Sequence, residues 1–165
     1  MNTVALRDRN GIVSPTETWG FFFMAQHPLL QPVVALLAWS MIMFIWMSAT
    51  RIPAMMKSDV DPKTKVGGVG KDLDAILPAE VQWKAQNYNH LMEQPTLFYA
   101  ACLVLVLAGC ESSIAVYAAW GYVALRVVHS LIQAIGNRVI YRFSVFLLAS
   151  LCLIVLIGFA VCSVF

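Results

Sequence analysis

Two charged residues lie inside stretches of sequence that are otherwise apolar, and they are the first candidates for chemistry. Glu93 falls within the apolar stretch Leu91–Cys110, and Arg126 falls within Ser112–Ile135. A charge near the middle of a membrane costs at least ~2.5–3.5 kcal/mol on insertion scales, so such residues are retained for a partner or for function. The plainer alternative is a structural ion pair between two helices, in which Glu93 and Arg126 only neutralise each other.

Other polar residues recur around both charges at the spacing of an α-helix. One set occupies positions i, i+3, i+4 and i+7: Gln86, Asn89, His90 and Glu93. The second set occupies positions i, i+3 and i+7: Arg126, His129 and Gln133. Each set lies on one face of its helix, and we expect the two faces to open into a shared pocket. The alternatives are that His129 is a satisfied core histidine and that the residues before Glu93 are solvated at the membrane interface.

The residue types that bind metals do not form a recognisable site. His90, Glu93 and His129 have no distinctive ligand spacing, so we predict no metal centre. The four cysteines lie within or at the ends of apolar stretches and include no CxxC pair: Cys102, Cys110, Cys152 and Cys162. This usage is typical of small buried hydrophobic residues rather than of a disulfide framework or a zinc site.

Composition indicates that these residues belong to a membrane protein. Of the 165 residues, 60% are apolar and 12% are charged, which is about half the charged fraction of an average soluble protein. Four stretches are long and apolar enough to cross a bilayer as helices, at residues 29–50, 91–110, 112–135 and 143–165. The sequence therefore predicts an all-α integral membrane protein, a four-transmembrane-helix bundle in which residues 1–165 form a single membrane domain.

Two segments lie outside the predicted spans. Residues 1–28 include a run of aromatic residues and are predicted to form an N-terminal interfacial segment. Residues 51–90 are predicted to form a cytoplasmic loop, in which a helix begins at Pro78 and continues without a break into the second span. Pro95 removes the donor to the carbonyl of Leu91, and we expect a kink there.

The basic residues predict the orientation in the membrane. Eight of the eleven Lys and Arg residues lie in the first and third loops: Arg51, Lys57, Lys63, Lys65, Lys71, Lys84, Arg138 and Arg142. The positive-inside rule places these loops in the cytoplasm and both termini on the non-cytoplasmic side. We expect a multi-pass protein, of the inner (plasma) membrane if it is bacterial. The net charge of +2 is small and unclustered, so no nucleic-acid partner is predicted. Arg51, Arg138 and Arg142 are also placed where arginine side chains anchor spans at the interface.

At these residues the sequence resembles the MAPEG family, membrane-associated proteins in eicosanoid and glutathione metabolism. Arg51 ends the first predicted span, and the run from Asn89 to Phe98 is similar to the family's Arg-Asn-x-x-Glu-x-x-Pro region at the start of the second. Arg126-Val127-Val128-His129 resembles its Arg-x-x-His in the third, and Arg138 and Arg142 resemble the basic residues before the fourth. The resemblance covers roughly residues 29–156.

This resemblance implies a homotrimer that binds glutathione as a co-substrate between neighbouring subunits, at the cytoplasmic side. Arg126 would be the catalytic residue, since a guanidinium near the sulfur favours the thiolate. The glutathione-binding residues would be Arg51, Asn89, His90, Glu93, His129 and Arg142. Arginine binds carboxylates through a bidentate fork, and Glu93 would pair with the amino group of glutathione. The thiolate would then attack a lipophilic small molecule dissolved in the membrane lipid.

The chain departs from the family pattern at four positions. The Arg-Asn pair before the glutamate falls on Asn89 and His90, and the two expected tyrosines fall on Gln133 and near Phe146. Two functions therefore remain open: a glutathione-dependent transferase or peroxidase, and a non-catalytic lipid-binding or scaffold protein of the same fold. A channel is less favoured, because no span carries polar residues along its whole length.

Overall fold

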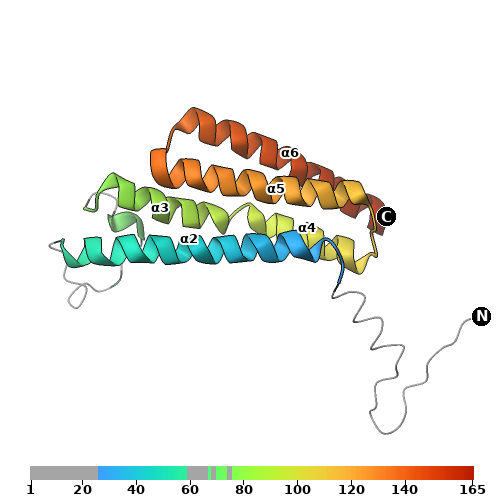
Figure 1. Ribbon diagram of the computed structural model, residues 1–165, viewed down its shortest axis with the longest axis horizontal. Helices are drawn as coiled ribbons and strands as arrows, with labels where there is room; N and C mark the ends of the chain where they lie inside the picture. The colour runs from blue at the N-terminus through green and yellow to red at the C-terminus, as the bar shows by residue number, and fades with distance from the viewer. Residues whose placement is uncertain (1–25, 59–66, 68–69, 74–75) are drawn as a thin grey trace, which may run out of the picture.

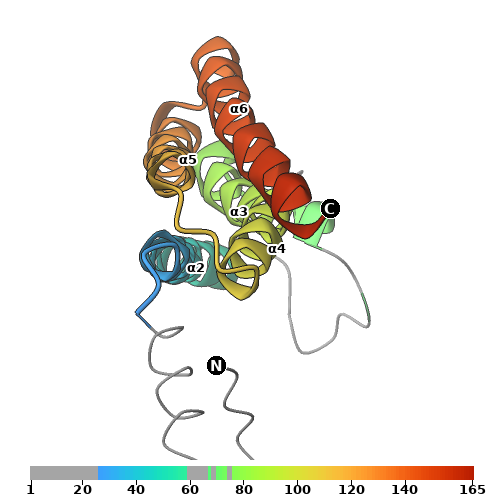
Figure 2. The same cartoon turned by 90° about the vertical axis from the view of Figure 1, so that its right-hand side faces the viewer.

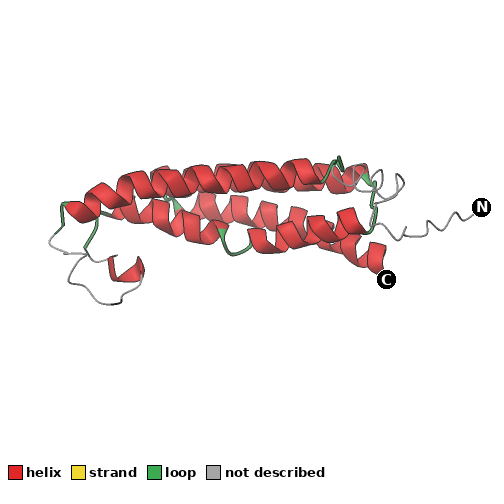
Figure 3. Cartoon of the chain, turned by 90° about the horizontal axis from the view of Figure 1, so that it is seen from below, coloured by secondary structure: helices red, strands yellow, loops and turns green. Residues whose placement is uncertain are grey.

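The computed structural model describes residues 26–58, 67, 70–73 and 76–165, and this part of the chain consists of helices and short connections (Figures 1 and 3). The elements, in order, are α2 (Leu30–Met56), the 3-10 helix η1 (Gly70–Leu73), α3 (Ala79–Leu91), α4 (Pro95–Leu107), α5 (Ser113–Leu131), the π-helix η2 (Ile132–Gly136) and α6 (Val139–Val164). Four helical segments are long and apolar enough to cross a membrane. The predicted all-α bundle of four spans is confirmed.

The first and last spans extend further toward the loops than their apolar cores. Helix α2 continues to Met56, so Arg51 lies within the helix rather than after it. Helix α6 begins at Val139, so Arg142 lies in its first turn. Both arginines are therefore held on rigid helices. The interfacial segment predicted for residues 1–28 lies almost entirely outside the described residues.

The second span is interrupted where an unbroken helix was predicted. Helix α3 begins after Pro78, as expected, but ends at Leu91, and α4 begins at Pro95. A turn at residues 92–94 separates them. Proline at the first position of α4 lacks the N–H that would have bonded to Leu91, and the chain responds with a break rather than a kink.

The helices alternate in direction, so the bundle has two distinct ends (Figure 1). The end where α2 finishes, α3 begins and α5 connects to α6 carries Arg51, Lys57, Lys84, Arg138 and Arg142. We call it the basic end, and it is the end predicted to face the cytoplasm. The other end, called the far end, holds the start of α2, the α4–α5 connection and the C-terminus. Gly109, with φ +66°, makes the α4–α5 turn.

The apolar core lies between the helices in the half of the bundle near the far end. Helices α5 and α6 have the most extensive contact of any pair (Figure 2). Small residues permit this approach: Ala115 and Ala119 are fully buried, and a Cβ on Gly121 would lie 3.4 Å from Cys152 Sγ. Ala115 and Ala119 therefore pack within the chain. The ring of Phe98 stacks on Tyr122, with centroids 4.6 Å apart.

Candidate functional site

Arg126 is fully buried, and it binds the end of a helix rather than a carboxylate. Its Nη2 donates to the backbone carbonyl of His90 at 2.8 Å and lies 3.2 Å from His90 Nδ1. The interruption of the second span leaves this carbonyl without an intrahelical donor, and a cation is favourable at the negative end of a helix. Arg126, from α5, therefore caps α3. Its Nε and Nη1 are buried and make no hydrogen bond within the described residues.

The contact with Arg126 determines the proton position on His90. A guanidinium only donates hydrogen bonds, so His90 Nδ1 must accept and the ring is neutral with its proton on Nε2. The His90 ring is half-buried and lies 5.0 Å from the ring of His129 and 5.4 Å from that of Phe146, between centroids. His90 therefore connects α3 to both α5 and α6.

His129 and Gln133 share the inward face with Arg126, as the spacing predicted. All three are buried. His129 Nδ1 lies 3.0 Å from the carbonyl of Arg142 and therefore donates to it, while Nε2 lies 3.2 Å from Gln133 Oε1. With one proton on the ring, the amide of Gln133 must turn its NH₂ toward Nε2. Both nitrogens of His129 thus have partners, as in a satisfied core histidine.

Glu93 is not where the ion-pair alternative required it. The residue is exposed, in the turn between α3 and α4, and its carboxylate forms no ion pair with Arg126 or with any other described residue. The helix ends two residues before Glu93, so the i+7 spacing from Gln86 no longer places it on the same face. The alternative of a Glu93–Arg126 ion pair is therefore not found within one chain.

The polar face predicted for the second span points away from the chain's own core. Gln86 and Asn89 are exposed, whereas α3 buries Gln82, Ala85, Asn87 and Leu91. Of the predicted set only His90 reaches inward. The expected shared pocket between the two polar faces is therefore wrong within one chain, where the faces touch through His90 alone.

Arg51 and Arg142 are each held by one contact near the basic end. Arg51 Nη2 donates to the carbonyl of Gly70 at 2.7 Å, and Arg142 Nη1 donates to Asn137 Oδ1 at 2.7 Å. Arg142 adjoins the cluster through its carbonyl, which His129 binds. Arg51 contacts the η1 segment and forms no hydrogen bond with Arg126, His90 or His129.

Two buried polar side chains without hydrogen-bond partners among the described residues were not predicted from the sequence. The side-chain amide of Asn87 is fully buried without a partner among the described residues, and so is the hydroxyl of Ser130. Asn87 shares a helix face with buried Leu91, four residues later, but the equally regular polar face through Gln86 and Asn89 meant that spacing alone did not place Asn87 inward. Ser130 had no signal beyond its place next to His129.

A further polar link spans the bundle at the interrupted turn. Gln94 Nε2 donates to Ser150 Oγ at 2.8 Å, and Tyr122 donates weakly to Gln94 Oε1 at 3.4 Å. Gln94 therefore ties the turn to α5 and α6 just below Arg126. It fixes the position of Glu93 beside it.

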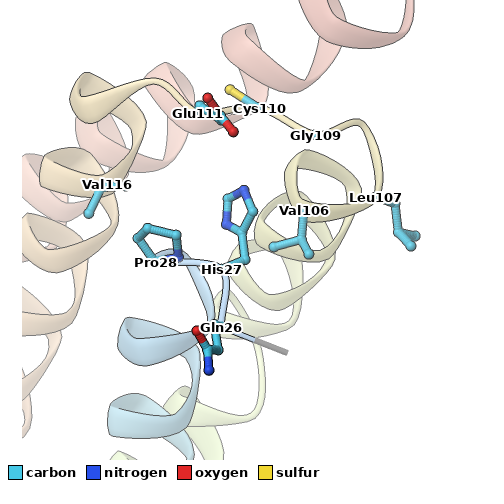
Figure 4. A pocket seen from close by; sticks show the side chains of 9 residues that line it. All are labelled: Gln26, His27, Pro28, Val106, Leu107, Gly109, Cys110, Glu111 and Val116. Carbon is cyan, nitrogen blue, oxygen red and sulfur yellow. The ribbon is translucent and has the colours of Figure 1, made fainter. Parts of the chain in front are cut away.

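A separate cavity lies at the far end, away from the predicted site residues (Figure 4). Its volume is about 510 Å³, and it lies between the start of α2, the end of α4 and the α4–α5 connection. His27 stands on one side, and Cys110 and Glu111 lie across from it. His27 Nδ1 accepts a hydrogen bond from the N–H of Leu29.

Comparison with known proteins gives one match. The family model of the MAPEG family matches residues 29–162, a range that includes nearly all of the four helical spans. No curated protein and no solved structure matches the chain.

Proposed function

Because this chain belongs to the MAPEG family, we propose that it binds glutathione and acts as a glutathione-dependent transferase or peroxidase on lipophilic small molecules. The binding site would lie toward the basic end, with Arg126 beside the sulfur. The observation that carries the proposal is the state of Arg126: a buried cation that forms no ion pair with any described residue and has two nitrogens without hydrogen bonds among them.

A buried charge without a counter-charge is costly unless something else completes it. A thiolate would supply both the missing charge and an acceptor for Nε or Nη1. Lowering the pKa of a thiol by two units requires about 2.7 kcal/mol of differential stabilisation, which lies within the range of one or two hydrogen bonds to a charged group. The Arg126 guanidinium is therefore suited to hold glutathione as a thiolate.

Access to Arg126 would be gained at the turn between α3 and α4. Met92 and Glu93 are exposed there, and the half-buried ring of His90 lies beside the guanidinium. Displacement of this ring would open Nη2 as well. The interruption of the second span would thus serve as the entrance for the sulfur.

The exposed polar face of α3 supports assembly as a homotrimer. Glu93 lies fourteen residues before Leu107, the last residue of α4, and hence about 21 Å from the far end at 1.5 Å per residue. In a hydrocarbon core of about 30 Å, that position is unfavourable for an exposed carboxylate facing lipid. A neighbouring copy would cover Gln86, Asn89 and Glu93, and glutathione bound between copies would place its amino group on Glu93.

The remaining arginines would hold the carboxylates of glutathione. Arg51 and Arg142 each commit one nitrogen to the chain, which leaves other N–H groups available. In the transferase reaction the thiolate sulfur forms a bond to an electrophilic carbon, and the group released takes up a proton. This proton is the one that the glutathione thiol loses to solvent, and the neutral His90, with its N–H at Nε2, would donate a hydrogen bond to the released group.

A second function, a non-catalytic lipid-binding or scaffold protein, is supported by Gln133 and Phe146. These residues stand where the family resemblance leads one to expect tyrosines, and Gln133 is already bonded to His129. Neither side chain can donate a phenolic proton. In this case the same fold would bind its partner without chemistry.

Calorimetric titration of glutathione into the detergent-purified protein distinguishes the two functions. We expect wild-type protein to bind and Arg126→Met to bind at least roughly tenfold more weakly, because hydrogen bonds to a charged group contribute about 1.5–3 kcal/mol each. The ultraviolet absorbance of bound thiolate should also disappear. Arg138→Gln is the matched control, since it removes an exposed arginine at the same end. If the wild-type protein binds no glutathione, the transferase or peroxidase proposal is wrong and the lipid-binding or scaffold function is favoured.

A further inference from the structure

A shallow apolar groove opens at the basic end, on the connection between α5 and α6. Its volume is about 340 Å³, and it is lined by Leu131, Ile132, Ile135, Gly136, Arg138 and Tyr141. We call it the η2 groove. The connection forms the end of the α5–α6 pair in Figure 1. None of these six residues belongs to the candidate glutathione site.

The π-helix and a glycine together shape this groove. In η2 the N–H of Asn137 donates to the carbonyl of Ile132 at 2.7 Å, five residues back, so the last turn of α5 is wider than an α-helical turn. Asn137 then adopts a left-handed conformation, with φ 45°, and reverses the chain. Gly136 has open space around its missing side chain, since a Cβ there would meet nothing within 4 Å.

The two arginines that flank this connection differ in exposure and in whether their side chains are already hydrogen-bonded. Arg142 is half-buried, and its Nη1 is bonded to Asn137. Arg138 is exposed, and its side chain forms no hydrogen bond or ion pair with any described residue. Arg138 therefore presents its full donor set and charge at the mouth of the η2 groove, next to the exposed ring of Tyr141.

We propose that the η2 groove binds one anionic phospholipid, with the phosphate on Arg138 and the upper part of an acyl chain along Leu131, Ile132 and Ile135. The helical segment continues for five residues after Leu131, to Gly136, before the chain reverses at Asn137, so the apolar wall extends about 7 Å into the membrane. This matches a headgroup at the interface with its chain directed toward the bilayer centre. Arginine and tyrosine are both favoured at that level.

Charge complementarity selects the anionic lipid. The basic end faces the cytoplasmic leaflet under the positive-inside rule, and this leaflet holds the anionic lipids. A basic residue near such a surface contributes about 1 kcal/mol, which corresponds to about a fivefold preference over a zwitterionic lipid. The proposal does not depend on glutathione binding, so either can fail without the other.

Native mass spectrometry of the detergent-purified protein tests the proposal, with phosphatidylglycerol and phosphatidylcholine of the same acyl chains as probes. Wild-type protein should retain phosphatidylglycerol about fivefold better than phosphatidylcholine. Arg138→Gln should abolish this preference and leave the weaker binding of both lipids. Gly136→Leu, which fills the groove at a position without a left-handed backbone, should weaken both lipids severalfold.

Two matched variants serve as controls. Lys57→Gln removes an exposed charge at the same end but outside the groove, and Gly136→Ala adds only a methyl group in open space. Both should bind lipid as wild type does. Loss of the preference in Lys57→Gln as large as in Arg138→Gln would show general charge attraction and overturn the proposal. An unchanged preference in Arg138→Gln would overturn it as well, since this exposed substitution does not disturb packing. Unchanged lipid binding in folded Gly136→Leu would exclude the groove.

Discussion

The two halves of the bundle bury different kinds of side chain. Toward the far end the helices interlock through apolar and small residues, with Leu105, Ala115, Ala119 and Leu156 fully buried. Toward the basic end the same helices bury polar residues: Gln82, Asn87, Arg126, His129, Ser130 and Gln133. Buried polar atoms without hydrogen bonds among the described residues occur in both halves, but the second half also holds a fully buried charged residue, Arg126. Natural proteins accept such local inconsistencies at functional sites, so the polar half is where the binding proposed above would lie.

From this comparison we expect the largest loss of stability on substitution of a fully buried side chain in the apolar half. Phe98 is fully buried and stacks on Tyr122. Phe98→Ala should lower the free energy of unfolding by about 3–5 kcal/mol, because it removes a large buried side chain and leaves a cavity. Unfolding of the purified protein in mixed micelles measures this loss. Leu97→Ala is the matched control on the preceding residue, whose side chain is 56% exposed, and it should cost far less.

If Leu97→Ala lowered the free energy of unfolding as much as Phe98→Ala, this expectation would be wrong. Such a result would mean that the outward face of α4 packs against another copy rather than lipid. Glutathione binding provides the complementary measurement, since folded Phe98→Ala should keep more of its affinity than Arg126→Met.

A smaller effect of opposite sign is expected in the polar half. Both side-chain polar atoms of Asn87 are buried without partners among the described residues. If the chain alone determines stability, Asn87→Leu should raise the free energy of unfolding by about 1–3 kcal/mol, the usual cost of an unsatisfied buried group. The same micelle unfolding measures it, and Gln86→Leu on the exposed neighbour is the control. Destabilisation by Asn87→Leu alone would reveal that the assembly or a ligand supplies a partner to this amide.

Sequence patterns predicted the apolar half better than the polar half, for a physical reason. Length and hydropathy determine the four spans, and helical spacing correctly placed Arg126, His129 and Gln133 on one buried face. The interruption before Pro95 was not predicted, because loss of one hydrogen bond permits either a kink or a break. The choice depends on a distant residue, Arg126, that caps the freed carbonyl of His90.

The face of α3 that is buried also could not be predicted from the sequence. Polar residues lie on more than one side of this helix, so spacing alone does not decide whether Gln86 or Asn87 points inward. Packing against α2 and η2 selects Asn87. The π-turn at η2 has no local sequence signature either, so the η2 groove could not be predicted from the sequence.

The smallest expected effect is the energetic coupling between the charged residues Glu93 and Arg126. Within one chain Glu93 and Arg126 form no ion pair, so Glu93→Gln should not offset the instability of Arg126→Ala. In a double-mutant cycle on purified protein the coupling energy between these residues should stay below roughly 0.5 kcal/mol, because they share no hydrogen bond and interact only through longer-range electrostatics. The matched cycle pairs Arg126→Ala with His90→Ala, whose ring lies 3.2 Å from the guanidinium, and should give roughly 0.5–3 kcal/mol. A larger coupling for Glu93 than for His90 would mean that a neighbouring copy brings its Glu93 to Arg126 in the assembled protein. The polar half would then be completed by the assembly, and dissociating the copies by dilution should remove the coupling.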